Sequence, residues 1–330
     1  MEANIGSGGL FVQELVTVAN HWLARFEAAL RLRDPARLQS LFHADSHWRD
    51  VLALTWHIRT VSGSAAVVAD LLRIEPVASG FGVDPDRTPP RHVTRAGTKC
   101  IEALFRFETA QGQGSGVVRL LAEEGTEPTA WTLLTALEEI KGHEEHTGRL
   151  RPTGQAYSRD FSGPNWLDLR KAAAAYADRD PAVLVVGGGQ AGLSIGARLT
   201  QRGVDTLIVD RWPRIGDNWR QRYHSLALHN QIHVNDLPYM PFPPTWPKYI
   251  PKDMLGNWFE YYAGAMEINF WTGTEFVGAT YDDAVRCWTA RLKRPDGSER
   301  TMRPRHLVFA NGVSGIPKIP SLPGLEDFAG

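Results

Sequence analysis

The feature that most constrains the fold is the stretch VLVVGGGQAGLSIGARL at residues 183–199. An apolar run typical of a buried parallel strand comes first, and it leads directly into three consecutive glycines. A helical pattern follows them. Gly187, Gly189 and Gly192 occupy the three glycine positions of G-x-G-x-x-G. Because strand, glycine turn and helix occur in this order, the stretch predicts a dinucleotide-binding βαβ unit.

Each glycine of the motif has a separate physical role. Gly187 lets the chain leave the strand in a tight turn, Gly189 lets a pyrophosphate approach the backbone, and Gly192 lets helix and strand pack closely. Gly188 occupies a free position, where we expect it to add only flexibility. A glycine-rich loop that binds nothing is the structural alternative.

The first helical turn and the next strand complete the predicted nucleotide site. The amides around Gln190 and Ala191 would face the phosphates at the helix N-terminus. The strand VDTLIVD ends at Asp210, about 20 residues beyond the motif, where an acidic side chain accepts hydrogen bonds from a ribose diol. It would also repel a 2′-phosphate, so this site should hold FAD or NAD and not NADP. Arg211, next to it, is a further candidate contact.

The segment after Asp210 distinguishes between these two cofactors. It contains IGDNWR at 215–220, LALHN at 226–230, LPYMPFP at 237–243 and LVFANGVSGIPKIPSLPG at 307–324. In this order, these motifs resemble the flavin-dependent monooxygenases of the flavin-containing monooxygenase class, which include plant auxin-forming enzymes and Baeyer–Villiger oxygenases. The resemblance runs from about 181 to 330. Asp217 stands where the family has a second glycine, and Asn311 where it has threonine.

The resemblance implies FAD as the cofactor and a Rossmann-type α/β FAD-binding domain. It adds these FAD-binding candidates: Gly216, Asn218, Trp219, Ala310, Asn311 and Gly312. Trp219 would lie near the isoalloxazine or its linker. His229 falls where relatives place a polar residue beside the flavin. It is the candidate catalytic residue, because it could stabilise the reduced or peroxidised flavin by hydrogen bonding; a structural role is the alternative.

The implied reaction uses two nucleotides. NADPH reduces FAD, O₂ forms a flavin hydroperoxide, and one oxygen passes to a nitrogen, sulfur or carbonyl carbon of a small-molecule substrate. The glycines at 6–9 and 112–116 lack the required spacing, so the NADPH site is expected beyond residue 330. Phe328-Ala329-Gly330 resembles the start of the family's F-x-G-x-x-x-H signature. We therefore expect a C-terminally truncated, incomplete FAD domain with an uncovered sheet edge, poorly soluble or dependent on a partner, and inactive alone.

Two other functions remain open. The chain could be a non-catalytic FAD-binding or interaction protein, or a simple FAD-dependent oxidase or reductase. The sequence does not identify the substrate, nor does it separate N- or S-oxygenation from Baeyer–Villiger chemistry.

Residues 10–141 have a different pattern, with helices first and strands after them. Helices are predicted at 11–31 and from Asp34-Pro35. A third begins at a serine cap in SGSAAVVADLLRIEP and ends before Pro76. A strand is predicted at 46–54, and Thr98–Glu108, Gly116–Ala122 and Trp131–Ile140 would form an antiparallel sheet. The element order resembles the α+β cone-like fold of nuclear transport factor and polyketide-cyclase-like proteins, which would allow a homodimer. Residues 142–180 would form a linker with one helix, capped by Asn165, and 181–330 the FAD-binding domain.

The composition restricts which classes of binding partner the chain can have. A formal net charge of −1 favours neither nucleic acid nor an anionic membrane surface, and no apolar run approaches the length of a membrane span. The two cysteines, Cys100 and Cys287, lie far apart and are expected to be reduced in a cytoplasmic protein. His43, Asp45 and His47 would share one strand face, but without a partner cluster we assign no metal.

Overall fold

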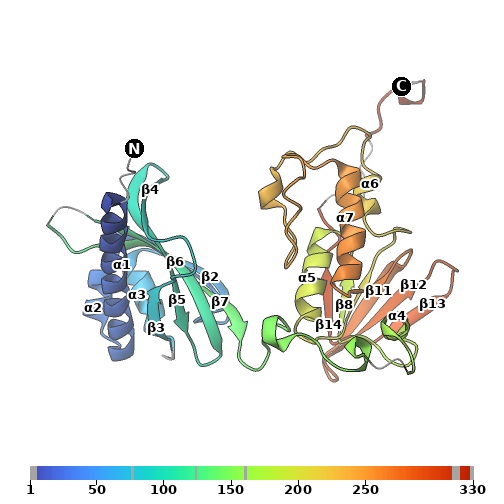
Figure 1. The fold of residues 1–330 in the computed structure, drawn as a ribbon, viewed down its shortest axis with the longest axis horizontal. Coiled ribbons are helices and arrows are strands. Elements are labelled where there is room, and N and C mark those ends of the chain that lie inside the picture. Colours follow the sequence, from blue (N-terminus) through green and yellow to red (C-terminus); the bar gives the residue numbers. More distant parts are fainter. Residues whose placement is uncertain (1–5, 76–77, 123–124, 160–161, 314–319, 328–330) are drawn as a thin grey trace. The chain divides into compact units, whose positions relative to one another are not determined.

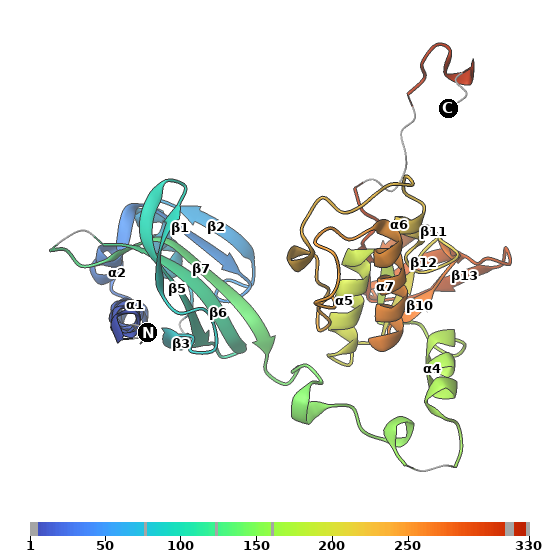
Figure 2. The same cartoon turned by 45° about the horizontal axis from the view of Figure 1, so that its top comes forward.

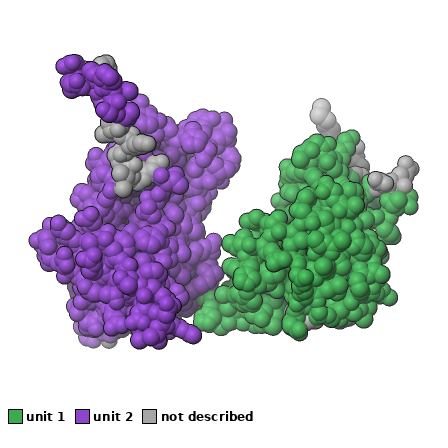
Figure 3. All heavy atoms as spheres, turned by 180° about the vertical axis from the view of Figure 1, so that it is seen from behind, with its two compact units in different colours: residues 1–144 green, residues 145–330 purple. Residues whose placement is uncertain are grey.

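The computed structural model describes residues 6–75, 78–122, 125–159, 162–313 and 320–327. The chain forms two compact units, residues 1–144 and residues 145–330 (Figures 1 and 3). Each unit is described below by itself. Among the described helices, none combines the length and the apolar character needed to cross a membrane.

Three helices form in unit 1: α1 (Gly6–Leu32), α2 (Pro35–Leu41) and α3 (Ser64–Leu71). The carboxylate of Asp34 accepts a hydrogen bond from the Arg37 amide at 3.0 Å, so α2 begins at the predicted cap. The predicted serine cap of α3 is wrong. The residue before that helix is Gly63, with a φ of +85° and no side-chain cap, and its amide donates to the Ser46 carbonyl.

The described part of unit 1 contains a seven-stranded sheet. Its strands are β1 (Phe42–Val51), β2 (Ile58–Ser62), β3 (Ser79–Val83), β4 (Arg91–Arg95), β5 (Thr98–Glu108), β6 (Gly112–Leu121) and β7 (Thr129–Ile140). The order is β2-β1-β7-β6-β5-β3, with β4 paired to β5. Strands β1 and β7 run parallel, whereas the other pairs are antiparallel. The predicted antiparallel pairing of β5, β6 and β7 is confirmed, and the parallel pairing of β1 with β7 makes the whole sheet mixed. No hairpin links β1 to β7, so no turn dictates their relative direction.

The core of unit 1 lies between α1 and the sheet, with α1 running along one sheet face (Figures 1 and 2). Trp22 and Phe26 of α1 stack with ring centroids 5.1 Å apart, and Phe81 stacks on Phe107 of the sheet at 4.8 Å. The Trp22 indole donates to the Leu41 carbonyl at 3.0 Å. Aromatic packing of this kind supplies much of the buried apolar surface. The unit is thus an α+β structure.

Unit 2 begins with the segment that leads to its sheet. It contains η1 (Gly148–Leu150), η2 (Gln155–Tyr157) and α4 (Trp166–Ala175). Asn165 caps α4 as predicted, in a reciprocal capping box with Asp168. Tyr176, directly after α4, is 1% exposed, and its hydroxyl donates to Asp205 and accepts from Asn269. The connecting helix is therefore tied to the sheet that follows it.

The central sheet of unit 2 is parallel, in the order β10-β9-β8-β14. Its strands are β8 (Val183–Val186), β9 (Thr206–Val209), β10 (Asn269–Trp271) and β14 (His306–Phe309). The helices are α5 (Gln190–Thr200), α6 (Asp217–Arg220) and α7 (Lys252–Ala265), with η3 (Ile232–Val234) and η4 (Leu325–Asp327). A second, antiparallel sheet contains β11 (Glu275–Asp282), β12 (Cys287–Lys293) and β13 (Glu299–Met302).

Both faces of the parallel sheet are covered, as its continuous apolar strands predict. Val183 and Val185 pack with residues of α5 and α7, while Leu184, between them, packs with residues of the second sheet and Tyr176. Side chains alternate because successive residues of a strand point to opposite faces. The predicted Rossmann-type α/β fold is confirmed for this unit.

Candidate functional site

The glycine turn lies at the carboxyl end of β8, and two of its glycines are required by geometry. Gly187 has a φ of +106°, and a Cβ there would lie 2.6 Å from the Ala310 carbonyl oxygen. A Cβ on Gly192 would lie 1.9 Å from the Gly187 carbonyl oxygen. Both distances are far shorter than the sum of the van der Waals radii. The predicted roles in turning the chain and packing helix on strand therefore agree with the observed contacts.

Gly189 differs from these two, because its backbone needs no glycine. It has a φ of −79°, and the nearest atom to a Cβ would be the Asn218 amide nitrogen at 3.1 Å. The space beside Gly189 is thus free of backbone. A phosphate group could approach there, and Asn218 lies close enough to contact it.

The structure contradicts the expectation that Gly188 adds only flexibility. A Cβ at this position would lie 2.2 Å from the ring of Phe270 in β10. Gly188 is buried, so the ring packs directly on the backbone of the turn. The glycine is needed for packing rather than for flexibility alone.

The N-terminus of α5 is open. Gly189 is the N-cap and provides no side-chain hydrogen bond, while Gln190 and Ala191 of the first turn are exposed. Amides in the first turn of a helix have no partner within the helix, and the helix dipole gives them a partial positive charge. This end of α5 is therefore suited to bind an anionic group.

Asp210 lies beside the same turn, directly after β9. Its Oδ2 accepts a hydrogen bond from the Gly188 amide at 2.6 Å, and its Oδ1 accepts from the Trp212 amide at 3.0 Å. Each carboxylate oxygen has two lone pairs, so one acceptor position remains on each oxygen for a ligand hydroxyl. Arg211 is exposed, and its guanidinium lies 5.5 Å from the centre of the Trp212 ring.

The segment containing Gly216 and Trp219 packs closely on α7. Gly216 has a φ of +90°, and a Cβ there would lie 2.2 Å from the Gly256 carbonyl oxygen. Asp217 is buried and forms a 3.0 Å ion pair with Arg220. Because Asp217 starts a helical turn, the backbone does not require glycine here. The carboxylate pairs with arginine instead and holds the short helix together.

A second ion pair ties this segment to α7. Arg214 contacts both carboxylate oxygens of Glu260, the shortest distance being 2.6 Å. The Arg214 guanidinium lowers the pKa of Glu260, and Arg220 adds to this effect. Glu260 is partly exposed, so the contact positions the segment more than it stabilises the fold.

A cavity of about 420 Å³ opens beside the first turn of α5, within the size range of small-molecule sites. Its lining residues come from α5, α7 and the segment between them: Gln190, Ala191, Ser194, Trp219, Leu228, His229, Asn230, Val234, Asn235, Asp236, Leu237, Leu255 and Phe259. The Trp219 Nε1 is buried without a hydrogen-bond partner among the described residues. Such a donor is costly unless a ligand or water accepts from it. This orphaned donor and the unfilled space beside Gly189 fit a bound flavin nucleotide.

His229 is exposed and lines this cavity together with Trp219. The chain around it is held by backbone hydrogen bonds: the Leu228 amide donates to Ile250, and the Lys252 amide donates to Leu226. The structure thus brings His229 to the same cavity as Gln190 and Ala191. Its chemical role stays a prediction.

The end of β14 supplies the last predicted residues. The Ala310 amide donates to the Val186 carbonyl at 2.8 Å, and the Asn311 amide lies close to Gly187. Asn311 and Gly312 are exposed, and Gly312 has a φ of +74°. The carboxyl ends of neighbouring parallel strands therefore meet at the glycine turn, the usual location of ligand sites in α/β sheets.

Some residues that line the cavity are not predicted by the sequence motifs. Ser194 lies one turn after Gln190 on α5, so helical spacing alone could have identified it. Leu255 and Phe259 line the cavity from α7, and only tertiary packing brings them there.

No metal centre emerges from the residues that the structure covers, because no group of three or more potential ligand side chains gathers among them. His47 Nε2 lies 3.6 Å from Asp45 Oδ1, and His43 Nδ1 accepts from the Asp45 amide. These contacts are local to β1.

Comparison with known proteins supports the interpretation of the glycine turn. Residues 180–223 match the family model described as an FAD binding domain. The chain is 38% identical over 151 residues to indole-3-pyruvate monooxygenase YUCCA1 of Oryza sativa subsp. japonica, covering 46% of this chain and 36% of that protein. It is 35% identical over 151 residues to the probable indole-3-pyruvate monooxygenase YUCCA4 of Arabidopsis thaliana, with the same coverage.

Among solved structures, the flavin-containing monooxygenase from Stenotrophomonas maltophilia shows 26% identity and a TM-score of 0.39, covering 46% of this chain and 44% of that one. The chain spans about a third of the length of the curated relatives it matches, 36% for both. The sequence matches confirm the resemblance to the flavin-containing monooxygenase class and the prediction of FAD as cofactor.

Proposed function

We propose that residues 181–330 hold FAD as the flavin-binding part of an NADPH-dependent monooxygenase, which oxygenates a nitrogen, sulfur or carbonyl centre of a small molecule. The observation that carries this proposal is the convergence at the end of β8. An uncapped helix N-terminus, an anchored carboxylate and a turn with space for a phosphate all meet there. The monooxygenase names of the relatives support the reaction class.

Each part of the site has a distinct binding role in this proposal. The amides at Gln190 and Ala191 bind the pyrophosphate, which reaches the backbone at Gly189. Asp210 accepts hydrogen bonds from the ribose hydroxyls with its unused lone pairs. Gly216, Asn218, Ala310, Asn311 and Gly312 complete the FAD contacts, with Arg211 at the adenosine end.

The cavity would surround the reactive part of the cofactor. The buried Trp219 N–H donates a hydrogen bond to it, and the apolar wall of Leu255 and Phe259 excludes water. His229, at the exposed side, would donate a hydrogen bond to the bound cofactor and so favour negative charge on it. When bound, the flavin supplies the redox and oxygen chemistry, and the protein supplies position and shelter.

Unit 1 would serve a different purpose. Its order of helices and strands supports the proposal of a cone-like fold over residues 10–141, joined by a linker at 142–180. We propose that this unit associates with a second copy of the chain.

The first test is a spectrum of the purified chain. We expect a yellow protein that binds one FAD per chain, because the turn, the carboxylate and the cavity lie in one unit. A protein that stays colourless after incubation with FAD would contradict the proposal and favour the non-catalytic interaction protein.

A second measurement concerns the reductant. The described residues contain one glycine turn between a buried strand and a helix, so we expect no NADPH oxidation by the isolated 330-residue chain, even with FAD bound. Anaerobic titration should bleach the flavin with dithionite but not with NADPH. Bleaching by NADPH would reveal a second nucleotide site within these residues.

Asp210→Ala should weaken FAD binding by about 1.5–3 kcal/mol, the range for losing a hydrogen bond to a charged acceptor. Quenching of flavin fluorescence during titration measures this difference. Asp282→Ala, at the exposed end of β11, is the matched control and should bind FAD like the wild type. Equal affinity of the Asp210 variant and the wild type would reject the ribose role.

A further inference from the structure

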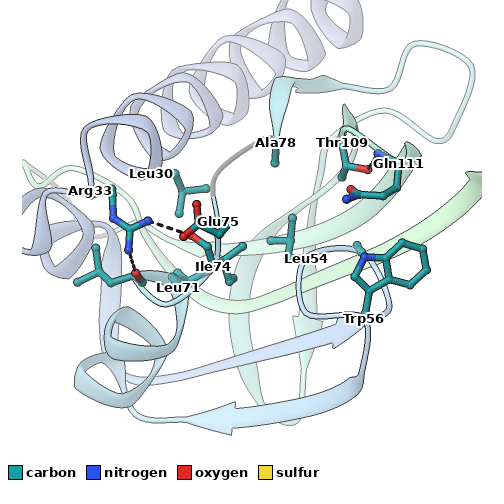
Figure 4. A pocket seen from close by; sticks show the side chains of 12 residues that line it. Leu30, Arg33, Leu54, Trp56, Leu71, Ile74, Glu75, Ala78, Thr109 and Gln111 are labelled. Atoms are coloured by element: carbon teal, nitrogen blue, oxygen red, sulfur yellow. Dashed lines mark hydrogen bonds between the residues drawn. The ribbon is translucent and has the colours of Figure 1, made fainter. Parts of the chain in front are cut away.

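Unit 1 contains a cavity of about 190 Å³ that the flavin site does not use (Figure 4). It lies among the end of α1, the loop after β1, the end of α3 and the turn between β5 and β6. Aliphatic side chains form most of its wall: Leu30, Ala53, Leu54, Leu71, Leu72 and Ile74. Leu54 points into the middle of the space (Figure 4).

Trp56 forms one side of the mouth and sits on an unusual backbone. It has a φ of +57°, and Leu52 in the same loop has a φ of +64°. Non-glycine residues in this region cost on the order of 1–3 kcal/mol each and persist only where the surroundings enforce them. The Trp56 side chain is nevertheless 47% exposed. The loop therefore holds a large aromatic ring at the mouth instead of burying it.

A buried carboxylate enforces this loop conformation. Asp50 is 0% exposed, and its Oδ2 accepts hydrogen bonds from the Thr55 amide at 2.8 Å and the Thr55 hydroxyl at 2.7 Å. Its Oδ1 accepts from the Thr135 hydroxyl at 2.6 Å, which in turn accepts from the Trp48 indole. Charge-assisted hydrogen bonds of this kind are strong. The cavity wall is thus preorganised before any ligand arrives.

The polar groups around the cavity leave no net charge for an ion to bind. Arg33 donates to the carbonyls of Leu72 and Ile74 at the end of α3, and Glu75 lies next to them. The Thr109 hydroxyl accepts a hydrogen bond from the backbone N–H of Gln111. The Gln111 side chain lies beside Trp56 at the mouth, where it can donate or accept one hydrogen bond (Figure 4).

We propose that this cavity binds a small neutral molecule with one aromatic ring or two fused rings and a single polar group. An apolar cavity of about 150 Å³ accommodates benzene, so this slightly larger space suits a ring of that order and excludes a flavin or a folded peptide. The ring would lie between Leu54 and Leu71, and Trp56 would cover it. The polar group would face Gln111.

The test uses the full chain, saturated with FAD, and 5-fluoroindole as the probe. Fluorine NMR should show saturable broadening and a shift of the probe signal. Leu54→Trp fills the cavity and should lower affinity at least about tenfold, since it removes the apolar space. Trp56→Gly keeps the positive φ without strain and should weaken binding about twofold to tenfold, the value of one aromatic contact.

Controls keep the result interpretable. Ile58→Ser alters an exposed apolar residue of the neighbouring strand that does not line the cavity, and this variant should bind the probe like the wild type. Near-ultraviolet circular dichroism checks that each variant is folded; because Trp56 is exposed, its variant tests the proposal even if Leu54→Trp unfolds. Absence of saturable binding to the wild type, or unchanged binding to folded Leu54→Trp or Trp56→Gly, would overturn the proposal.

Discussion

Gly189→Val is expected to abolish FAD retention while both units stay folded. Gly189 has an ordinary negative φ, and the nearest neighbour of an added Cβ is the end of the flexible Asn218 side chain at 3.1 Å. A valine can therefore be accommodated by the protein alone. Its methyl groups would occupy the space where the pyrophosphate must reach the backbone. The flavin-to-protein ratio after purification measures the effect.

Gly264→Val is the matched control for this substitution. Gly264 lies in α7, where a Cβ meets nothing within 4 Å. It should keep a normal flavin content. If the Gly189 variant also purified with a normal flavin content, the assignment of the pyrophosphate site would be wrong.

Gly192→Ala should have the opposite signature, a loss of stability in unit 2. The added Cβ would lie 1.9 Å from the Gly187 carbonyl oxygen and 3.0 Å from its carbonyl carbon, and these backbone atoms cannot move away as the end of a side chain can. Overpacking commonly costs about 1–3 kcal/mol, and this contact should reach at least about 3 kcal/mol. Urea unfolding followed by tryptophan fluorescence measures the change.

Gly196→Ala provides the comparison for this prediction. Its Cβ would meet the Cδ1 of Ile208 at 2.8 Å, the far end of a side chain that can change rotamer. It should therefore cost clearly less than Gly192→Ala. Equal costs would show that the contact with Gly187 does not set the packing distance between α5 and β8.

The parts of the site that could be predicted from sequence are those encoded locally. The glycine turn and Asp210 lie within one βαβ unit, where strand, turn and helix spacing fixes the geometry. The packing role of Gly188 does not follow from its neighbours in sequence, because its constraint, the ring of Phe270, comes from a strand much later in the chain. No local pattern encodes such a contact.

The same distinction explains the rest of the fold. The cap at Asp34 and the capping box at Asn165 follow from neighbouring residues, and both form as predicted. The parallel pairing of β1 with β7 depends on which sheet edge receives β1, and hydrophobic alternation carries no information on strand direction. The wall of the cavity beside α5 likewise depends on how α7 docks.

The attachment of Tyr176 has a consequence for the modularity of the chain. This residue contributes to the core beneath β8 and β9 and bonds to Asp205, although it precedes the first strand of the parallel sheet. A flavin module excised at Pro181 would lose this buried ring, whereas one excised at Glu145 would retain it. Whether by gene fusion or by protein engineering, the natural point for exchanging the N-terminal unit is therefore the junction at residues 144–145.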